Sequence, residues 1–498
     1  MKLISANSAK LLSVEATNQW GLNHFALIEA AGRLSADAVV KQFPEHFKRN
    51  PRVIAFCGHE TSASCTMVML RSLILSGVIS VSQAALVITK LPVRTDRDVW
   101  SESFHALVKM FVPCFLWDPS VYRLLDDTNI LLDGVSSAEN NSALTESQVK
   151  MVEMINKNQK LIVFSVGVPS GASEMWERGM PIIESDATVA VEPLDPILYW
   201  PSIRPFAGTI IPVTGLYPSN LIESFKGPEL LDWNAAKTRI LSIAPDSYKY
   251  TRGVVEIRAG SVGTAGAARI AARGAQAAGA GLVRLIVDPD IYPVVASSAD
   301  GIMVSPSDEE PFHPDAVLVG PGWGQSSDRN HILEKCLVQE SHGIPLVLDA
   351  DAIALARSLR FHGNALFTPH LGEFAVLAGI DIEDSRSRLI DRVQALAKTK
   401  NAVILLKGHT LCVAAPDGRL GFVDGMSPVL ATGGTGDLLA GICTALAARS
   451  NRAGSVDLFS CAMVAATLLI EASKSFTCFI DPMELAGTVA SLAGSAWL

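Results

Sequence analysis

Short apolar runs rich in Val, Ile and Leu recur along this sequence and constrain its fold more than any other feature. These apolar runs end at Gly, Pro or Asp, as in RVIAFCG, KLIVFSVGVPSG, AVLVGPGWG, PLVLDADA and AVILLKG. Longer segments rich in Ala and Leu separate them. Buried parallel strands joined by crossover helices have this pattern. The sequence therefore predicts an α/β fold, in which ligands bind beyond the carboxyl ends of the strands.

The length of the chain predicts more than one domain. Its 498 residues exceed the size of one ordinary hydrophobic core, and two domains are the simplest division. Between Pro212 and Arg252 the sequence is polar and rich in turn residues, without a sustained strand pattern. We expect the boundary there and predict domains of residues 1–225 and 226–498.

Composition and charge favour an enzyme that acts on small molecules. Hydrophobic residues make up 49% of the chain, and its net charge of −9 offers no basic field to hold nucleic acid. The eight cysteines form no CxxC pair, so we expect them to be reduced. The beginning of the chain lacks a secretory pattern, and the run LFSCAMVAATLLIEA is too short to cross a membrane. We expect a cytoplasmic protein without a membrane span.

The segment ATGGTGDLLAGICTALAA, which begins at Ala431, carries the sharpest functional signal. Its glycines 433, 434 and 436 allow the backbone to approach an anion closely, and the following helix directs unpaired N–H groups at it. A carboxylate beside a phosphate site is suited to take a proton from an attacking hydroxyl, so Asp437 is the candidate base. The alternative is that Asp437 only caps a helix.

Other strand ends supply further candidates. Lys407 follows the run AVILL and can neutralise phosphate charge, although solvated lysines are common. The glycine-rich and small-residue turn at 260–267 permits close approach of a ligand, or simply tight helix packing. GPGWG, DADA and TPHLGEF each end a predicted strand. Taken singly, His370 could be a loop histidine, and Asp349 or Asp351 could cap a helix.

In this order, TPHLGE, LLKG and GGTGD make residues 233–498 resemble the ADP- or ATP-dependent NAD(P)H-hydrate dehydratases, relatives of the ribokinase-like small-molecule kinases. The resemblance implies a ribokinase-like fold with a central, mainly parallel sheet. It also implies that ADP or ATP phosphorylates the ring hydroxyl of (6S)-NAD(P)HX, after which phosphate is eliminated and NAD(P)H is restored. Mg²⁺ would bridge the phosphates.

The same resemblance implies roles for individual residues, with Asp437 as the base. The positions that match those holding the hydrated cofactor are Ala267, Gly324, His370 and Asp437. The positions that match those binding the nucleotide are Lys407, Gly408, His409, Thr410, Leu411 and Gly436. ADGIMV and DADAIA depart from the family pattern. A kinase of another small molecule stays open, because the phosphate loop and Asp437 would serve any hydroxyl acceptor.

The N-terminal part resembles the NAD(P)H-hydrate epimerase domain that often precedes this dehydratase. The matching pieces are FALIEAAGRLSADAV, RVIAFCG, LLDGVSS, VGVPSGAS and ESDATVAVEP. The resemblance implies a Rossmann-like three-layer sandwich, and Asp133 and Ser170 match positions that bind K⁺ in the epimerases.

Two departures from the epimerase pattern predict that this half has lost the reaction. HETSASCT replaces a phosphate-binding loop rich in Asn, Gly and Asp, and Gly167 stands at the position of the catalytic carboxylate. Glycine cannot transfer a proton, so we expect a scaffold or an oligomerisation surface in a homo-oligomer. The alternatives are that Glu60 substitutes for the lost acid, or that the chain is fully bifunctional.

Overall fold

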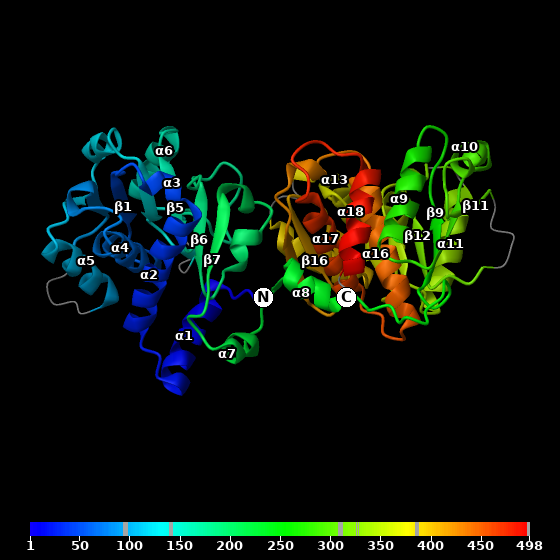
Figure 1. Ribbon diagram of the computed structural model, residues 1–498, viewed down its shortest axis with the longest axis horizontal. Helices are drawn as coiled ribbons and strands as arrows, with labels where there is room; N and C mark the ends of the chain where they lie inside the picture. The colour runs from blue at the N-terminus through cyan, green and yellow to red at the C-terminus, as the bar shows by residue number, and fades with distance from the viewer. Residues whose placement is uncertain are drawn as a thin grey trace. The chain divides into compact units, whose positions relative to one another are not determined.

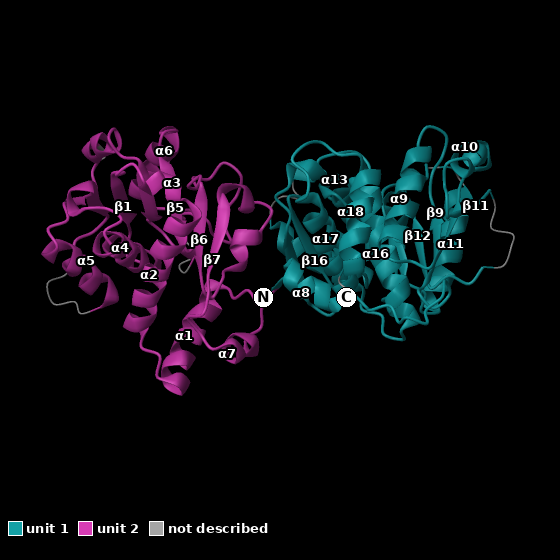
Figure 2. Cartoon of the chain, viewed as in Figure 1, with its two compact units in different colours: residues 1, 229–498 teal, residues 2–228 magenta. Residues whose placement is uncertain are grey.

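The computed structural model describes residues 1–92, 98–138, 143–306, 312–324, 326, 328–383 and 388–495. Two compact units make up the chain, one of residues 2–228 and one of Met1 with residues 229–498 (Figure 2). Each unit is built on its own β-sheet. Among the described helices, none is both long and apolar enough to cross a lipid bilayer.

In the unit of residues 2–228, the described strands form a parallel sheet in the order β3-β2-β1-β4-β5-β6-β7 (Figure 1). Its strands are β1 Val53–Cys57, β2 Ala84–Ile88, β3 Cys114–Leu116, β4 Ile130–Gly134, β5 Ile162–Val166, β6 Ala187–Val191 and β7 Thr209–Val213. Its helices are α1 Ala6–Trp20, α2 His24–Gln42, α3 Pro44–Phe47, α4 Thr61–Leu75, α5 Val99–Lys109, α6 Glu146–Lys157 and α7 Ser219–Ser224.

Side-chain alternation along β1 shows that helices cover both faces of this sheet. Val53, Ala55 and Cys57 belong to a core shared with α2, α4 and α5. Ile54 and Phe56 face the opposite way and share a second core with α6. Because successive side chains of a strand point to opposite faces, the unit has three layers. This confirms the expected Rossmann-like three-layer sandwich.

In the unit of residues 229–498, the described strands form one mixed sheet in the order β11-β10-β9-β12-β13-β14-β15-β16-β17-β8. Neighbouring strands are parallel except at β15–β16 and β16–β17. The strands are β8 Glu229–Leu230, β9 Val254–Arg258, β10 Leu282–Ile286, β11 Met303–Ser305, β12 Ala316–Val319, β13 Leu346–Leu348, β14 Ala365–Phe367, β15 Val403–Leu406, β16 Thr410–Ala414 and β17 Leu420–Asp424. The expected α/β architecture with a central, mainly parallel sheet is confirmed.

Small side chains allow helices to pack closely on this second sheet. The helices are α8 Trp233–Ala236, α9 Ala265–Ala277, α10 Tyr292–Ala296, α11 Asp328–Ser341, α12 Asp351–Leu355, α13 Leu371–Ala378, α15 Leu389–Lys400, α16 Thr435–Arg452, α17 Leu458–Ser473 and α18 Pro482–Ser495. The side chains of α9, α16, α17 and α18 share one buried core with Val255 and Ile257 of β9. Any Cβ on Gly441 of α16 would lie 2.0 Å from the carbonyl oxygen of Ala271 in α9, so only glycine permits this approach.

The order of the strands gathers the sequence motifs at one edge of the sheet. β9, β12, β13, β14 and β15 are parallel neighbours, so their carboxyl ends lie side by side. The turns that follow them carry the glycine-rich segment after β9, then GPGWG, DADA, TPHLGE and LLKG. The topology therefore brings together segments that lie far apart in the sequence.

Candidate active site

A glycine turn opens α16 at this edge of the sheet. Gly434 precedes the helix with a φ of +95°, a conformation that glycine adopts without strain. The Thr435 hydroxyl donates to the carbonyl oxygens of Leu430 and Thr432, both at 2.9 Å, which fixes the turn. The first backbone N–H groups of an α-helix have no partner within the helix. The start of α16 is therefore built to receive an anion.

Lys407 places a positive charge beside this turn. Its Nζ lies 2.8 Å from Asp349 Oδ1 and 3.8 Å from Glu373 Oε2. A Cβ added to Gly436 would lie 3.2 Å from the same nitrogen, so the ammonium group adjoins the first turn of α16. Burial alone would lower the pKa of Lys407, but Asp349, Glu373 and Asp437 raise it overall. The side chain therefore remains a cation.

Asp437 is the third residue of α16, and Gly434 occupies the capping position, so the helix-cap alternative is wrong. Burial raises the pKa of Asp437 to about 7, with further increases from Asp349 and Glu373 and an opposing effect of Lys407. Among the described residues, none forms a hydrogen bond or ion pair with this carboxylate. The carboxyl group can therefore exchange a proton near neutral pH, as a general base must.

His370 caps α13 and extends the charged network. Its Nδ1 accepts hydrogen bonds from the backbone N–H groups of Gly372 at 3.0 Å and Glu373 at 3.2 Å. This geometry assigns the ring proton to Nε2, which lies 3.4 Å from Glu373 Oε1. Burial raises the pKa of Glu373, and Lys407 opposes that effect. Thus the histidine has a structural role and also connects to the lysine through Glu373.

Ala267 lies in the first turn of α9, and Gly324 lies in the loop after β12. The carbonyl oxygen of Gly322 accepts hydrogen bonds from Thr264 Oγ1 at 2.7 Å and Ser261 Oγ at 3.1 Å, which joins the turn after β9 to the turn after β12. A Cβ on Gly322 would lie 3.0 Å from the Ala267 Cβ. These contacts form a wall of small residues near the starts of α9 and α12.

Asp349 and Asp351 do not cap helices, contrary to one reading of the sequence. Asp349 accepts from Lys407 and from the Thr368 hydroxyl, both at 2.8 Å. Asp351 Oδ2 accepts from the Gly324 backbone N–H at 2.8 Å. In the sequence both residues stand among the strand-end candidates only as part of DADA, and Glu373 has no predicted role. The DADA segment directly after β13 was the available signal.

The remaining predicted nucleotide positions follow Lys407. Gly408 and His409 form the turn between β15 and β16, and the His409 carbonyl oxygen accepts from the Gly425 N–H at 2.9 Å. Thr410 Oγ1 is buried and has no hydrogen-bond partner among the described residues. The side chain of Leu411 lies in the hydrophobic core. The Leu411 side chain is therefore part of the core and does not face a ligand.

Asp133 and Ser170 of the other unit bind each other. The buried Asp133 carboxylate accepts from the Ser165 and Ser170 hydroxyls, both at 2.6 Å, and from the N–H groups of Ser170 at 2.9 Å and Val135 at 3.2 Å. Burial raises the pKa of Asp133 despite these bonds. Four protein donors satisfy this carboxylate, so these residues do not fit the expected K⁺ site.

The segment HETSASCT is mostly helical, because α4 begins at Thr61. Glu60 precedes the helix, and its Oε2 accepts a hydrogen bond from the Ser137 N–H. Gly167 follows β5 with a φ of +85°, and a Cβ there would meet no atom closer than 4.0 Å. A side chain at Gly167 would therefore have space but a strained backbone.

The mainly parallel sheet, the glycine turn and Lys407 define an α/β protein with a phosphate-binding site at the carboxyl ends of its strands. A family model described as NAD(P)H-hydrate dehydratase matches residues 255–483, and one described as YjeF-related protein N-terminus matches residues 24–195. A relative in Xanthomonas campestris, ADP-dependent (S)-NAD(P)H-hydrate dehydratase, is 31% identical over 239 residues, which are 45% of this chain and 82% of the relative. The chain belongs to the NAD(P)H-hydrate dehydratase family.

Other similarities extend over more of the chain. The bifunctional NAD(P)H-hydrate repair enzyme Nnr of Escherichia coli is 27% identical over 449 residues, covering 87% of this chain and 82% of the relative. Among solved structures, the ADP/ATP-dependent NAD(P)H-hydrate dehydratase of Bacillus subtilis, co-crystallised with ATP/Mg²⁺, is 21% identical with a TM-score of 0.48. That alignment covers 54% of this chain and 99% of the other.

Proposed function

We propose that the unit of residues 229–498 repairs nicotinamide cofactors by dehydrating (6S)-NAD(P)HX to NAD(P)H, with ADP or ATP as co-substrate. The observation that carries the proposal is Asp437, a carboxyl with a pKa of about 7 in the first turn of a helix that is open to phosphate. Family membership supports the same conclusion, since the Xanthomonas relative is a dehydratase by name.

In the proposed reaction, Asp437 accepts the proton of the ring hydroxyl as its oxygen attacks the terminal phosphorus of the nucleotide. The bond between that phosphorus and the bridging oxygen breaks, and the leaving group is AMP when ADP is the donor or ADP when ATP is the donor. Loss of a ring proton and cleavage of the carbon–oxygen bond then release phosphate and restore the dihydropyridine. Lys407 and the N–H groups of α16 stabilise the phosphate charge.

The proposed contacts follow from the two groups of residues at the strand ends. Ala267, Gly324 and His370 would line the cofactor side. Lys407, Gly436 and the turn at residues 408–411 would hold the nucleotide, and the buried Thr410 hydroxyl would gain the polar partner it lacks among the described residues.

Mg²⁺ fits this site as a companion of the phosphates. The described residues contain no group of three or more His, Cys, Asp or Glu side chains arranged to hold a metal. Mg²⁺ commonly keeps several waters and takes most of its other ligands from substrate phosphates, so a complete protein cage is unnecessary. The ion would neutralise phosphate charge that Lys407 alone does not balance.

We also propose that the unit of residues 2–228 has lost the epimerase reaction. Gly167 supplies no proton-transfer group, and Glu60 is engaged by the Ser137 N–H. The second candidate is a bifunctional epimerase and dehydratase, which the similarity to Nnr over most of the chain favours. A scaffold role, assembly into a homo-oligomer and a cytoplasmic location stay predictions from the sequence.

Recovery of nicotinamide absorbance tests both units together. The purified protein is mixed with ADP, Mg²⁺ and an equilibrated mixture of the two NADHX epimers, and the assay is repeated with ATP. Rapid recovery that stops when the S epimer is exhausted is expected. Rapid recovery to completion would establish the bifunctional candidate instead.

Analysis of the products separates the dehydratase from a kinase of another small molecule. A dehydratase releases free phosphate together with NADH, whereas a kinase accumulates a phosphorylated acceptor. Absence of recovery with both nucleotides would refute the proposed function.

A further inference from the structure

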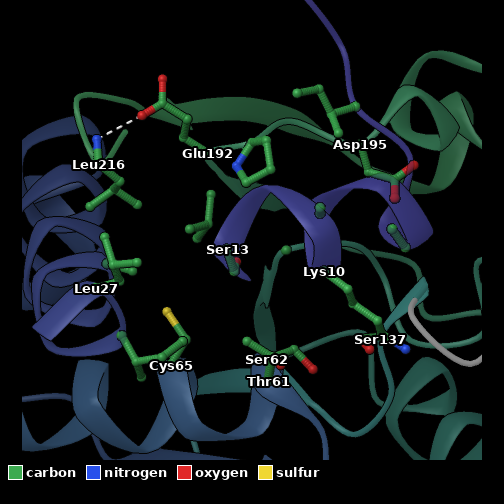
Figure 3. A pocket seen from close by; sticks show the side chains of 18 of the residues that line it. Lys10, Ser13, Leu27, Thr61, Ser62, Cys65, Ser137, Glu192, Asp195 and Leu216 are labelled. Atoms are coloured by element: carbon green, nitrogen blue, oxygen red, sulfur yellow. Dashed lines mark hydrogen bonds between the residues drawn. The ribbon is translucent and has the colours of Figure 1, made fainter. Parts of the chain in front are cut away.

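A cavity of about 500 Å³ lies within the unit of residues 2–228. It is located beyond the carboxyl ends of β5 and β6, between α1, α2 and the start of α4 (Figure 3). One face of α1 covers it, with Lys10 and Ser13 turned inward, and Leu27, Thr61 and Cys65 lie opposite. The volume is within the range of small-molecule sites in proteins.

The described wall of this cavity is mostly apolar. Side chains from both the helices and the strand ends contribute to it, including Ile4, Leu27, Ile28, Val166, Val191 and Leu216. The polar exceptions include Ser13 and Tyr217, whose hydroxyl oxygens lie 3.0 Å apart. Such a wall removes apolar ligand surface from water and offers a few hydrogen bonds for orientation.

The ionisable side chains of the described wall offer little charge to a ligand. The Glu192 carboxylate accepts from the N–H groups of Leu216 at 2.6 Å and Tyr217 at 3.0 Å, and its oxygens turn toward that backbone (Figure 3). Burial raises the pKa of Asp195 to about 7. Lys10 is the one lysine among the described lining residues, so little positive charge is available to a polyphosphate.

The start of α4 is also a poor phosphate site. In parallel α/β units the N-terminus of the helix after a strand commonly receives a phosphate. Here Glu60 stands directly before α4, and its carboxylate binds the Ser137 N–H. A negative side chain thus adjoins the start of α4, and it would repel a phosphate bound there.

From these contacts we propose that the cavity is a binding site for an uncharged, mainly apolar small molecule, which the Ser13 and Tyr217 hydroxyls orient by hydrogen bonds. α1 covers the bound molecule.

The test uses the full chain and the neutral fluorescent probe 1-N-phenylnaphthylamine. Ser13→Trp fills the cavity from α1, and Leu11→Trp adds the same indole at an exposed position of the same helix. Binding to Ser13→Trp is expected to weaken by at least about tenfold, because the indole occupies the space that the probe needs. Binding to Leu11→Trp should equal that of the unchanged protein.

Three further measurements keep the outcome unambiguous. Thermal unfolding of both variants verifies that they fold, and hydrogen exchange of the α1 amides should slow in the unchanged protein when the probe is present. ADP-ribose, a charged dinucleotide fragment, should not displace the probe. Equal binding by Ser13→Trp and Leu11→Trp, absence of probe binding, or displacement by ADP-ribose would each overturn the proposal.

Discussion

Replacement of Asp437 by Asn gives the most direct test of the active site. The amide keeps the size of the side chain and cannot accept the hydroxyl proton. Removal of a general base lowers kcat by about 10²- to 10⁴-fold, or about 3 to 5 kcal/mol in the activation barrier. We expect a decrease in that range, measured as NADH absorbance recovery at saturating ADP and (6S)-NADHX.

The pH dependence of the unchanged enzyme provides the second half of this test. With a pKa of about 7 for Asp437, about one tenth of the carboxyl is ionised at pH 6 and about nine tenths at pH 8. Because kcat/KM reports the free enzyme, it should rise about tenfold over this interval. Asp437→Asn should remove the rise, and Asp417→Asn should keep it, because hydrogen bonds with Arg419 help hold the Asp417 pKa below its ordinary value.

The thermal stability of Asp437→Asn shows whether a loss of activity comes from the missing base or from unfolding. A carboxyl whose pKa is raised in the folded state contributes stability at low pH that is lost as pH rises from its unfolded value toward about 7. Asp437→Asn should therefore be at least as stable as the unchanged protein at pH 8 in thermal unfolding. A folded Asp437→Asn variant that retains more than about a tenth of kcat would refute the assignment of the base.

Three other substitutions follow from the described contacts. Lys407→Met removes the cation beside the buried Asp349, so the free energy of unfolding should fall by about 3 to 5 kcal/mol near neutral pH. The KM for ADP should also rise, and an unchanged KM would contradict nucleotide binding by this lysine. Gly167→Asp should fail to restore epimerisation of (6R)-NADHX, because the phosphate loop is also lost; turnover of the R epimer by this variant would contradict that view. The same variant should lower the free energy of unfolding by about 1 to 3 kcal/mol, because the backbone at this position has a positive φ. Asp133→Asn replaces an acceptor of four hydrogen bonds and should lower the free energy of unfolding by about 1 to 3 kcal/mol, measured in urea. The unchanged protein should show no change in stability on addition of K⁺; stabilisation by K⁺ but not by Na⁺ would contradict this and support the cation site.

The sequence by itself determined the α/β class and the motifs of the phosphate site. Short apolar runs that end at Gly, Pro or Asp predict buried parallel strands because a fully buried strand needs apolar side chains on both faces. Gly434 and Asp437 were also predictable as local features, since a positive φ and an open helix start depend on a few neighbouring residues.

Only the tertiary structure decided which charges meet. Lys407 and Asp349 are 58 residues apart in the chain, yet their side chains lie 2.8 Å apart because they follow β15 and β13, which only β14 separates in the sheet. The raised pKa of Asp437 likewise depends on burial and on carboxylates from other strand ends. In the other unit, packing satisfied Asp133 with protein donors and left a cavity beside Gly167. Distances and burial of this kind arise from the three-dimensional packing of distant segments, which local sequence patterns do not specify.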